Sequence, residues 1–253
     1  MSKEKLPPLS INLLFLPLFF IVLIWGVYWL DWNNFYELRE YGVLPRTILG
    51  LRGIVFSPFI HGSIKHLYNN SIALFVLLLM LQYFYKKQTL SVLLWGIILS
   101  GFGTWLIGRE SYHIGASGLI YVLVSFMFFK GMLTQYYRLM ALSFLIVILY
   151  GGLVWYMFPD VEEGISWEGH LSGFLTGMLL SVFISNPEHI EKGYKYEWQD
   201  PNFDAQSDPF MKCFDENGNF IIIPKEKVLK YSDPYRSSLP VVLLEGIDRY
   251  WIK

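Results

Sequence analysis

The charged residues of this 253-residue chain are segregated, and this feature limits most strongly how the chain can fold. Only 16% of its residues are Asp, Glu, Lys or Arg, whereas a soluble domain carries about a quarter. Between the charged clusters lie uncharged stretches of about 18 to 22 residues, the length of an α-helix that crosses a bilayer. Helices satisfy their backbone hydrogen bonds internally, as a bilayer requires. The sequence therefore predicts an all-α polytopic membrane protein.

Six predicted spans fill residues 9–186, after a short polar leader at residues 1–8. The spans are residues 9–30, 67–85, 89–107, 117–130, 139–158 and 167–185. No Asp, Glu, Lys or Arg is predicted inside a span core. The long connection at residues 31–59 is too apolar for disorder, so it is predicted to lie partly immersed against the bundle.

The orientation in the membrane follows from Lys and Arg near the span ends, which favour the cytoplasmic side. One side of the predicted bundle collects the larger set, namely Lys3, Lys5, Lys86, Lys87, Lys130, Arg138, Lys192 and Lys195. Both termini are therefore predicted to be cytoplasmic. The loops that hold His61 and Gly115, and the start of the last span, then fall on the outer side.

Residues 187–253 are too polar to span a membrane and are predicted to form a small cytoplasmic tail or module. Within the tail, residues 211–223 read as a β-hairpin, with Asn217-Gly218 suited to a type I′ turn. Cys213 is the single cysteine, so no intramolecular disulfide is expected. The net charge of −1 argues against nucleic acid as a partner.

Histidine is costly inside a bilayer, so histidines in or beside spans are candidates for function. Four of the five histidines lie at predicted outer ends of spans or just before the fourth span: His61, His66, His113 and His170. The alternative for any single one is a buried residue that is hydrogen-bonded to a backbone carbonyl. His189 lies beyond the last span and is predicted to be a surface residue.

Ser117 is predicted to begin the fourth span, where unpaired N–H groups carry partial positive charge. A serine oxygen there can attack a carbonyl while nearby N–H groups hold the oxyanion. Tyr121 lies one helical turn further on. The alternative for Gly115-Ala116-Ser117-Gly118 is small-residue packing between spans.

Spacing places further polar groups on common helix faces. His66 and Asn70 are four residues apart, so both can donate hydrogen bonds from one face. His170, Gly173 and Gly177 form one stripe, and the glycines permit a close helix neighbour. If that neighbour is the helix of Ser117, a nucleophile, a base and two oxyanion donors are all present.

With these motifs in order, the chain resembles the rhomboid family of intramembrane serine proteases. The motifs are His61-x4-His66-x3-Asn70, Gly115-Ala116-Ser117-Gly118 and Gly169-His170-x2-Gly173-x3-Gly177. They fall on the second, fourth and sixth spans of a predicted six-helix rhomboid-like bundle. The resemblance covers residues 9–185 and leaves the tail unexplained.

The resemblance implies a catalytic Ser117–His170 dyad without a carboxylate, acting through an acyl-enzyme and needing no cofactor or metal. It also implies an oxyanion site from His66, Asn70 and the Ser117 N–H. The implied supporting residues are His61, Gly115, Tyr121, Gly173 and Gly177. The implied partners are single-span or multi-span membrane proteins cleaved near the outer membrane face, and a bacterial inner membrane is the expected location.

One feature departs from the family pattern. Many rhomboids carry a Trp-Arg pair eight residues before the first histidine, where this chain has Arg52-Gly53. Glu168 resembles a third member of a catalytic triad, but residues two apart on a helix do not face each other, so it is interpreted as favourable charge at a helix N-terminus.

Three other functions remain as alternatives. The first is a catalytically inactive rhomboid-like protein that binds or escorts membrane proteins; such relatives typically lose the serine or the histidine. A transporter or channel would place charged ligands within its spans. A zinc-dependent protease would need a ligand set such as His-Glu-x-x-His, which the sequence lacks.

Overall fold

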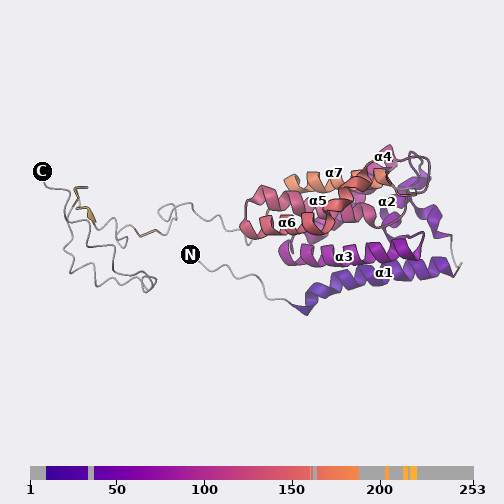
Figure 1. Cartoon of the computed structure of the whole chain (residues 1–253), viewed down its shortest axis with the longest axis horizontal. Coiled ribbons are helices and arrows are strands. Elements are labelled where there is room, and N and C mark those ends of the chain that lie inside the picture. Colours follow the sequence, from indigo (N-terminus) through magenta and orange to yellow (C-terminus); the bar gives the residue numbers. More distant parts are fainter. Residues whose placement is uncertain are drawn as a thin grey trace. The chain divides into compact units, whose positions relative to one another are not determined.

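The computed structural model describes residues 10–33, 37–159, 161, 164–187, 203–204, 213–215 and 217–220. Within these residues the chain is helical, with two isolated β-bridges and no longer strand (Figure 1). The α-helices are α1 (Phe15–Trp32), α2 (Gly53–Phe56), α3 (Ile64–Phe84), α4 (Thr89–Ile107), α5 (Ser117–Thr134), α6 (Tyr137–Tyr150) and α7 (Trp167–Phe183). The 3₁₀ segments are η1 (Ile11–Leu14), η2 (Leu38–Tyr41), η3 (Leu49–Arg52), η4 (Ser57–Phe59) and η5 (Gly151–Met157).

Helix α5 occupies the centre of the bundle. It contacts α3, α4, α6 and α7, while α1 lies along α3 (Figure 1). Large apolar side chains from these helices form one core, with Leu74 of α3 and Phe126 of α5 fully buried in it. The helix that begins with Ser117 is therefore held on all sides by its neighbours.

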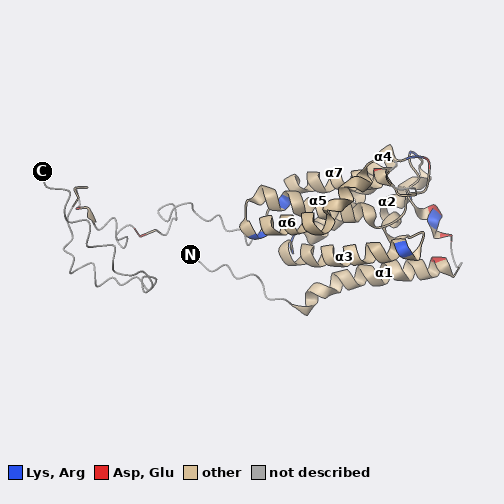
Figure 2. Cartoon of the chain, in the orientation of Figure 1, with Lys and Arg blue, Asp and Glu red and all other residues tan. Residues whose placement is uncertain are grey.

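The outer surface of the bundle is apolar. Exposed side chains include Leu90 of α4, Ile148 of α6 and Val182 of α7. Lys, Arg, Asp and Glu gather mainly toward the two ends of the helices, and the sides between them are almost free of charge (Figure 2). Such a surface suits contact with lipid rather than water.

Five helical segments of the described residues are long and apolar enough to cross a membrane. They are Ile11–Trp32, Ile64–Phe84, Thr89–Ile107, Ser117–Thr134 and Tyr137–Met157. This confirms the prediction of a mostly helical chain with several spans. Helix α7 has 17 residues and ends before the predicted residue 185, so the count of six spans stays a prediction.

The prediction that no charged residue lies inside a span is wrong. The fourth span was expected to end at Lys130, but α5 continues to Thr134 and Lys130 is buried within it. The ammonium group donates hydrogen bonds to the carbonyl of Ser181, at 3.0 Å, and to that of Ile184. These carbonyls lie at the C-terminal end of α7, where they have no N–H partner within the helix. Their partial negative charge compensates the buried ammonium group.

The same region receives a second side chain. Gln88 Nε2 donates to the carbonyl of Asn186 at 3.1 Å and to that of Ser185 at 3.4 Å. The segment that follows α7 is therefore bonded to two other parts of the bundle.

The fifth predicted span, residues 139–158, is interrupted. Helix α6 ends at Tyr150, and η5 continues the segment as 3₁₀ helix. The break coincides with Gly151-Gly152, and two adjacent glycines weaken an α-helix.

The connection between α1 and α3 lies against the bundle, as predicted. A Cβ atom on Gly101 of α4 would lie 2.9 Å from the backbone of Ile54, and one on Gly53 would lie 2.2 Å from the backbone of Gly42. Backbones can approach this closely only where side chains are absent.

The chain divides into two compact units, Met1–Glu191 and Lys192–Lys253. In the second unit, Phe214 and Phe220 form an isolated antiparallel bridge. An Asp215 carboxylate oxygen accepts hydrogen bonds from the N–H groups of Asn217 and Asn219 within the bridged turn. Gly218 has a φ of 80°, and a type I′ turn at Asn217-Gly218 needs a positive φ at both residues, so the turn type stays a prediction.

Most of the predicted hairpin, the leader at residues 1–8 and His189 lie outside the described residues. The hairpin and the cytoplasmic module therefore stay predictions.

Candidate active site

Ser117 is the first residue of α5. Gly115, two residues earlier, has φ 112°, a conformation open to glycine, and its N–H donates to the carbonyl of Ser57 at 2.9 Å. The N-cap residue Ala116 has no side-chain oxygen, so it cannot cap the first N–H groups of α5. The Ser117 hydroxyl and the uncapped start of the helix therefore lie together.

His170 lies in the first turn of α7, and its ring is fixed by two contacts. Nδ1 lies 2.8 Å from the carbonyl oxygen of Tyr156 in η5. A carbonyl can only accept, so Nδ1 carries a proton, and Nε2 of the neutral ring keeps its lone pair. The ring also stacks on Tyr121, with centroids 4.4 Å apart and planes at 15°.

Tyr121 is itself anchored to the same irregular segment. Its hydroxyl donates to the carbonyl of Leu153 at 2.6 Å. Because Tyr121 and His170 both bond to η5, this segment sets the position of the stacked pair.

Two glycines of α7 bring that helix against α5. A Cβ atom on Gly173 would lie 2.2 Å from the carbonyl oxygen of Gly118, and one on Gly177 would lie 2.3 Å from that of Val122. Since no real Cβ contact is this short, both positions admit only glycine at this helix spacing.

His66 and Asn70 lie on one face of α3, next to Gly115. A Cβ atom on Gly115 would lie 2.5 Å from His66 Cε1 and 3.6 Å from Asn70 Nδ2. Asn70 is 6% exposed, and its Nδ2 has no hydrogen-bond partner among the described residues. A buried amide without a partner is costly, which makes this group available to a ligand oxygen.

His61 lies behind His66, with ring centroids 5.1 Å apart. It is 1% exposed, so its imidazole is enclosed by the protein. Burial, assisted by the His66 ring, lowers the pKa of His61 to about 4. His61 is therefore a neutral imidazole at neutral pH.

One cavity of about 850 Å³ joins these elements. Five of the predicted site residues line it: His66, Asn70, Ser117, Tyr121 and His170. His61, Gly115, Gly173 and Gly177 do not line it and instead pack behind its walls. The Ser117 hydroxyl makes no hydrogen bond to a described residue, so Ser117 and His170 share the cavity without being bonded to each other.

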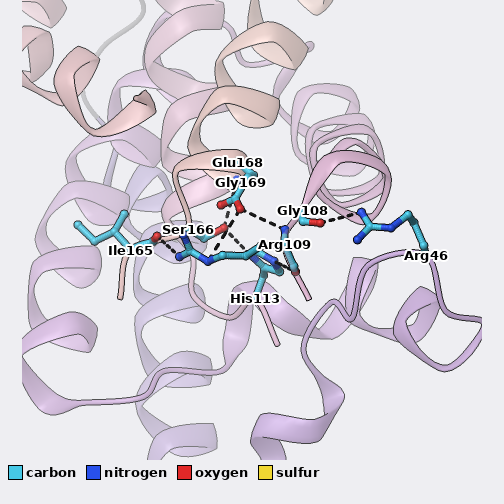
Figure 3. A network of polar contacts seen from close by, with 8 residues as sticks. All are labelled: Arg46, Gly108, Arg109, His113, Ile165, Ser166, Glu168 and Gly169. Atoms are coloured by element: carbon cyan, nitrogen blue, oxygen red, sulfur yellow. Dashed lines mark hydrogen bonds and ion pairs between the residues drawn. The ribbon is translucent and has the colours of Figure 1, made fainter. Parts of the chain in front are cut away.

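A polar network beside the cavity was missed by the sequence analysis (Figure 3). Glu168 is 1% exposed, and its Oε1 accepts from the Arg109 N–H at 3.1 Å and lies 3.9 Å from Arg109 Nε. The carboxylate thus faces Arg109, in addition to lying in the first turn of α7. Ser166 caps α7 by accepting from the Gly169 N–H at 3.2 Å. A serine three residues before Gly169 was the available sequence signal for this cap.

Among the described residues, no group of three or more His, Cys, Asp or Glu is placed to hold a metal ion.

Proteins with similar sequences occur in mycobacteria. The chain is 32% identical over 186 residues to Uncharacterized protein Rv1337 of Mycobacterium tuberculosis, which covers 70% of this chain and 77% of that protein. Uncharacterized protein Mb1372 of Mycobacterium bovis gives the same values. Uncharacterized protein ML1171 of Mycobacterium leprae is 29% identical, with 70% of this chain and 73% of that protein covered.

The family model described as the rhomboid domain matches residues 50–187, which hold α3 to α7 and the five predicted site residues that line the cavity. The chain is thus an integral membrane protein that belongs to the rhomboid family.

Proposed function

We propose that this chain is an intramembrane serine endopeptidase that cleaves membrane proteins through an acyl-enzyme formed on Ser117. The observation that carries the proposal is the bond from His170 Nδ1 to the Tyr156 carbonyl. It leaves Nε2 as the only ring nitrogen that can accept a proton, in the cavity that Ser117 also lines.

In the first half-reaction, Ser117 Oγ attacks the scissile carbonyl carbon and His170 Nε2 takes the hydroxyl proton. The carbonyl oxygen becomes an oxyanion, which Asn70 Nδ2, His66 and the Ser117 N–H stabilise. The C–N bond then breaks, and His170 gives its proton to the leaving amine. In the second half-reaction a water molecule attacks the ester in the same way, releasing the carboxylate and restoring Ser117.

Substrate binding completes the geometry in this mechanism. Ser117 and His170 are not hydrogen-bonded to each other without substrate, and catalytic hydrogen bonds commonly tighten in the Michaelis complex. The 850 Å³ cavity has room for an extended peptide segment and for the hydrolytic water. A transmembrane substrate must therefore unwind locally to present its bond.

We infer that α7 is the sixth span, because a helix of 17 residues is at the lower limit of about 17 to 25 for spanning a bilayer. The Lys and Arg distribution then places both termini in the cytoplasm and the cavity toward the outer face of a bacterial inner membrane. Residues 187–253 form a cytoplasmic module outside the protease domain. The substrates are membrane proteins cut near their outer ends.

The test is cleavage of a single-span model substrate by the purified protein in detergent. The wild type is expected to cleave it and to react with a fluorophosphonate probe at Ser117. Ser117→Ala and His170→Ala are expected to lose cleavage by at least about 10³-fold while keeping the same melting temperature within a few degrees.

Full cleavage by Ser117→Ala would refute the mechanism. A wild type that is folded, binds substrate and neither cleaves nor reacts with the probe would favour the alternative, a rhomboid-like protein that binds or escorts membrane proteins.

A further inference from the structure

The segment before α5 is bonded to the segment that begins α7 (Figure 3). The Arg109 N–H donates to Glu168 Oε1, and the Arg109 guanidinium donates to the carbonyl of Ile165. Four residues further along, His113 Nδ1 lies 2.5 Å from Ser166 Oγ. These contacts connect residues 109–113 with residues 165–169.

The two ring nitrogens of His113 have different partners. Nε2 lies 3.0 Å from the Arg109 carbonyl oxygen, which can only accept, so Nε2 carries the proton. Burial lowers the pKa of His113, with opposing influences from Glu168 and Arg109, so the ring is neutral at neutral pH. Nδ1 then accepts a hydrogen bond that the Ser166 hydroxyl donates.

Ser166 connects His113 to the first turn of α7, which holds His170. Its Oγ donates to His113 and accepts from the Gly169 N–H, the amide next to His170. On the other side, the backbone of His113 pairs with Val43 through two hydrogen bonds, at 3.0 and 2.9 Å. Ser117 lies four positions after His113 in the chain.

We propose that His113 is a positioning residue, which sets the separation of Ser117 and His170 by tying the segment before α5 to the N-cap of α7. The inference rests on the proposed protease function. His113 lines the cavity, but both of its ring nitrogens are engaged, so it has no free group to offer a substrate. It acts on the reaction only through the placement of the dyad.

The first test is a double-mutant cycle on cleavage. His113→Ala is expected to lower kcat about 10- to 100-fold with KM changed less than about twofold, because a displacement near 1 Å can cost 10²-fold in rate. Ser166→Ala is expected to do the same. The double variant should be no slower than the slower single variant, because both remove one connection. His113→Asn, whose Oδ1 replaces Nδ1 as acceptor, is expected to recover most of kcat.

Ser143→Ala is the matched control. Ser143 is fully buried and donates to the Phe128 carbonyl at 2.8 Å, between α6 and α5. Its loss removes a buried hydrogen bond without touching residues 109–113 or 165–169, so kcat should stay near the wild-type value. Equal slowing by Ser143→Ala and His113→Ala, or additive effects of His113→Ala and Ser166→Ala, would overturn the proposal.

Hydrogen exchange gives a readout that does not need proteolysis. The amides of residues 167–170 should exchange at least about tenfold faster in His113→Ala than in Ser143→Ala. A wild type without proteolytic activity would refute the proposed function. Unchanged exchange in His113→Ala would refute the connection itself.

Discussion

The imidazole of His170 lies flat on the ring of Tyr121, with the two centroids 4.4 Å apart, and each ring is tied to a backbone carbonyl of η5. The two side chains come from different helices, so the pair fixes α5 and α7 relative to each other near their N-terminal ends. The orientation of His170 therefore depends on Tyr121 and on η5.

Two substitutions of Tyr121 distinguish the contribution of its ring from that of its hydroxyl. Tyr121→Phe keeps the stack and loses the bond to Leu153, which should lower the free energy of unfolding by about 1 kcal/mol and leave kcat within about threefold. Tyr121→Ala removes the support of the ring and should lower kcat about 10-fold or more at unchanged KM. Steady-state cleavage of a model substrate measures both. A fully active Tyr121→Ala enzyme would contradict a role for the stack.

Asn70→Ala tests the oxyanion site. An interaction made mainly in the transition state lowers kcat and kcat/KM together, and loss of one donor typically costs about 10²–10³ in turnover. KM should change little. Because Asn70 Nδ2 has no partner among the described residues, its removal breaks no hydrogen bond within the fold.

A chelator distinguishes this role from metal binding. Cleavage should resist a strong chelator, and elemental analysis should find no stoichiometric zinc. Zinc that is lost in His66→Ala, together with activity that the chelator abolishes, would overturn the assignment of His66 and Asn70 to the oxyanion.

Gly173→Ala and Gly26→Ala make a matched pair within helices. A methyl group at Gly173 would overlap the Gly118 carbonyl, whereas one at Gly26 of α1 meets nothing within 4 Å. Gly173→Ala should lower the free energy of unfolding by about 1–3 kcal/mol and reduce activity. Gly26→Ala should be neutral or stabilise by up to about 1 kcal/mol. Melting temperatures and cleavage rates check both, and equal stability of the two variants would contradict the close helix contact.

The neutral state of His61 predicts how stability varies with pH. Its pKa is about 4 in the fold and about 6.5 when unfolded, so between these values the unfolded chain binds more protons. Stability should fall as the pH drops from about 6.5 to 4, with a contribution from His61 of up to about 3 kcal/mol. The pH dependence should be smaller in His61→Asn. Unfolding at several pH values, followed by tryptophan fluorescence, tests this, and identical slopes for the two proteins would contradict it.

The spans could be predicted because a bilayer demands long uncharged helices, and α4 has the predicted bounds of residues 89–107. The end of α5 could not be predicted in this way. A lysine normally marks the end of a span. Helix α5 nevertheless continues past Lys130, because the carbonyls at the end of α7 accept hydrogen bonds from its ammonium group. That compensation is a tertiary contact between residues far apart in the chain.

The candidate site could likewise be predicted only in part. Spacing along single helices predicted that His66 and Asn70 share a face and that Gly173 and Gly177 share another, and the structure places them so. The partners of His170 and Tyr121 had no sequence signal, because they are backbone carbonyls of Tyr156 and Leu153 in a 3₁₀ segment. Any residue type could supply those oxygens. Their position follows from where α6 breaks at Gly151-Gly152.

The hydrogen bonds from Lys130 and Gln88 to residues 181–186 hold the chain in place where it leaves the helical bundle. A pull on the chain beyond residue 187 would load these side chains before it could unwind the last turn of α7. Tension would then pass through these hydrogen bonds into α5 and the start of α4, rather than along α7 to His170. A load on the tail would then leave the position of His170 unchanged.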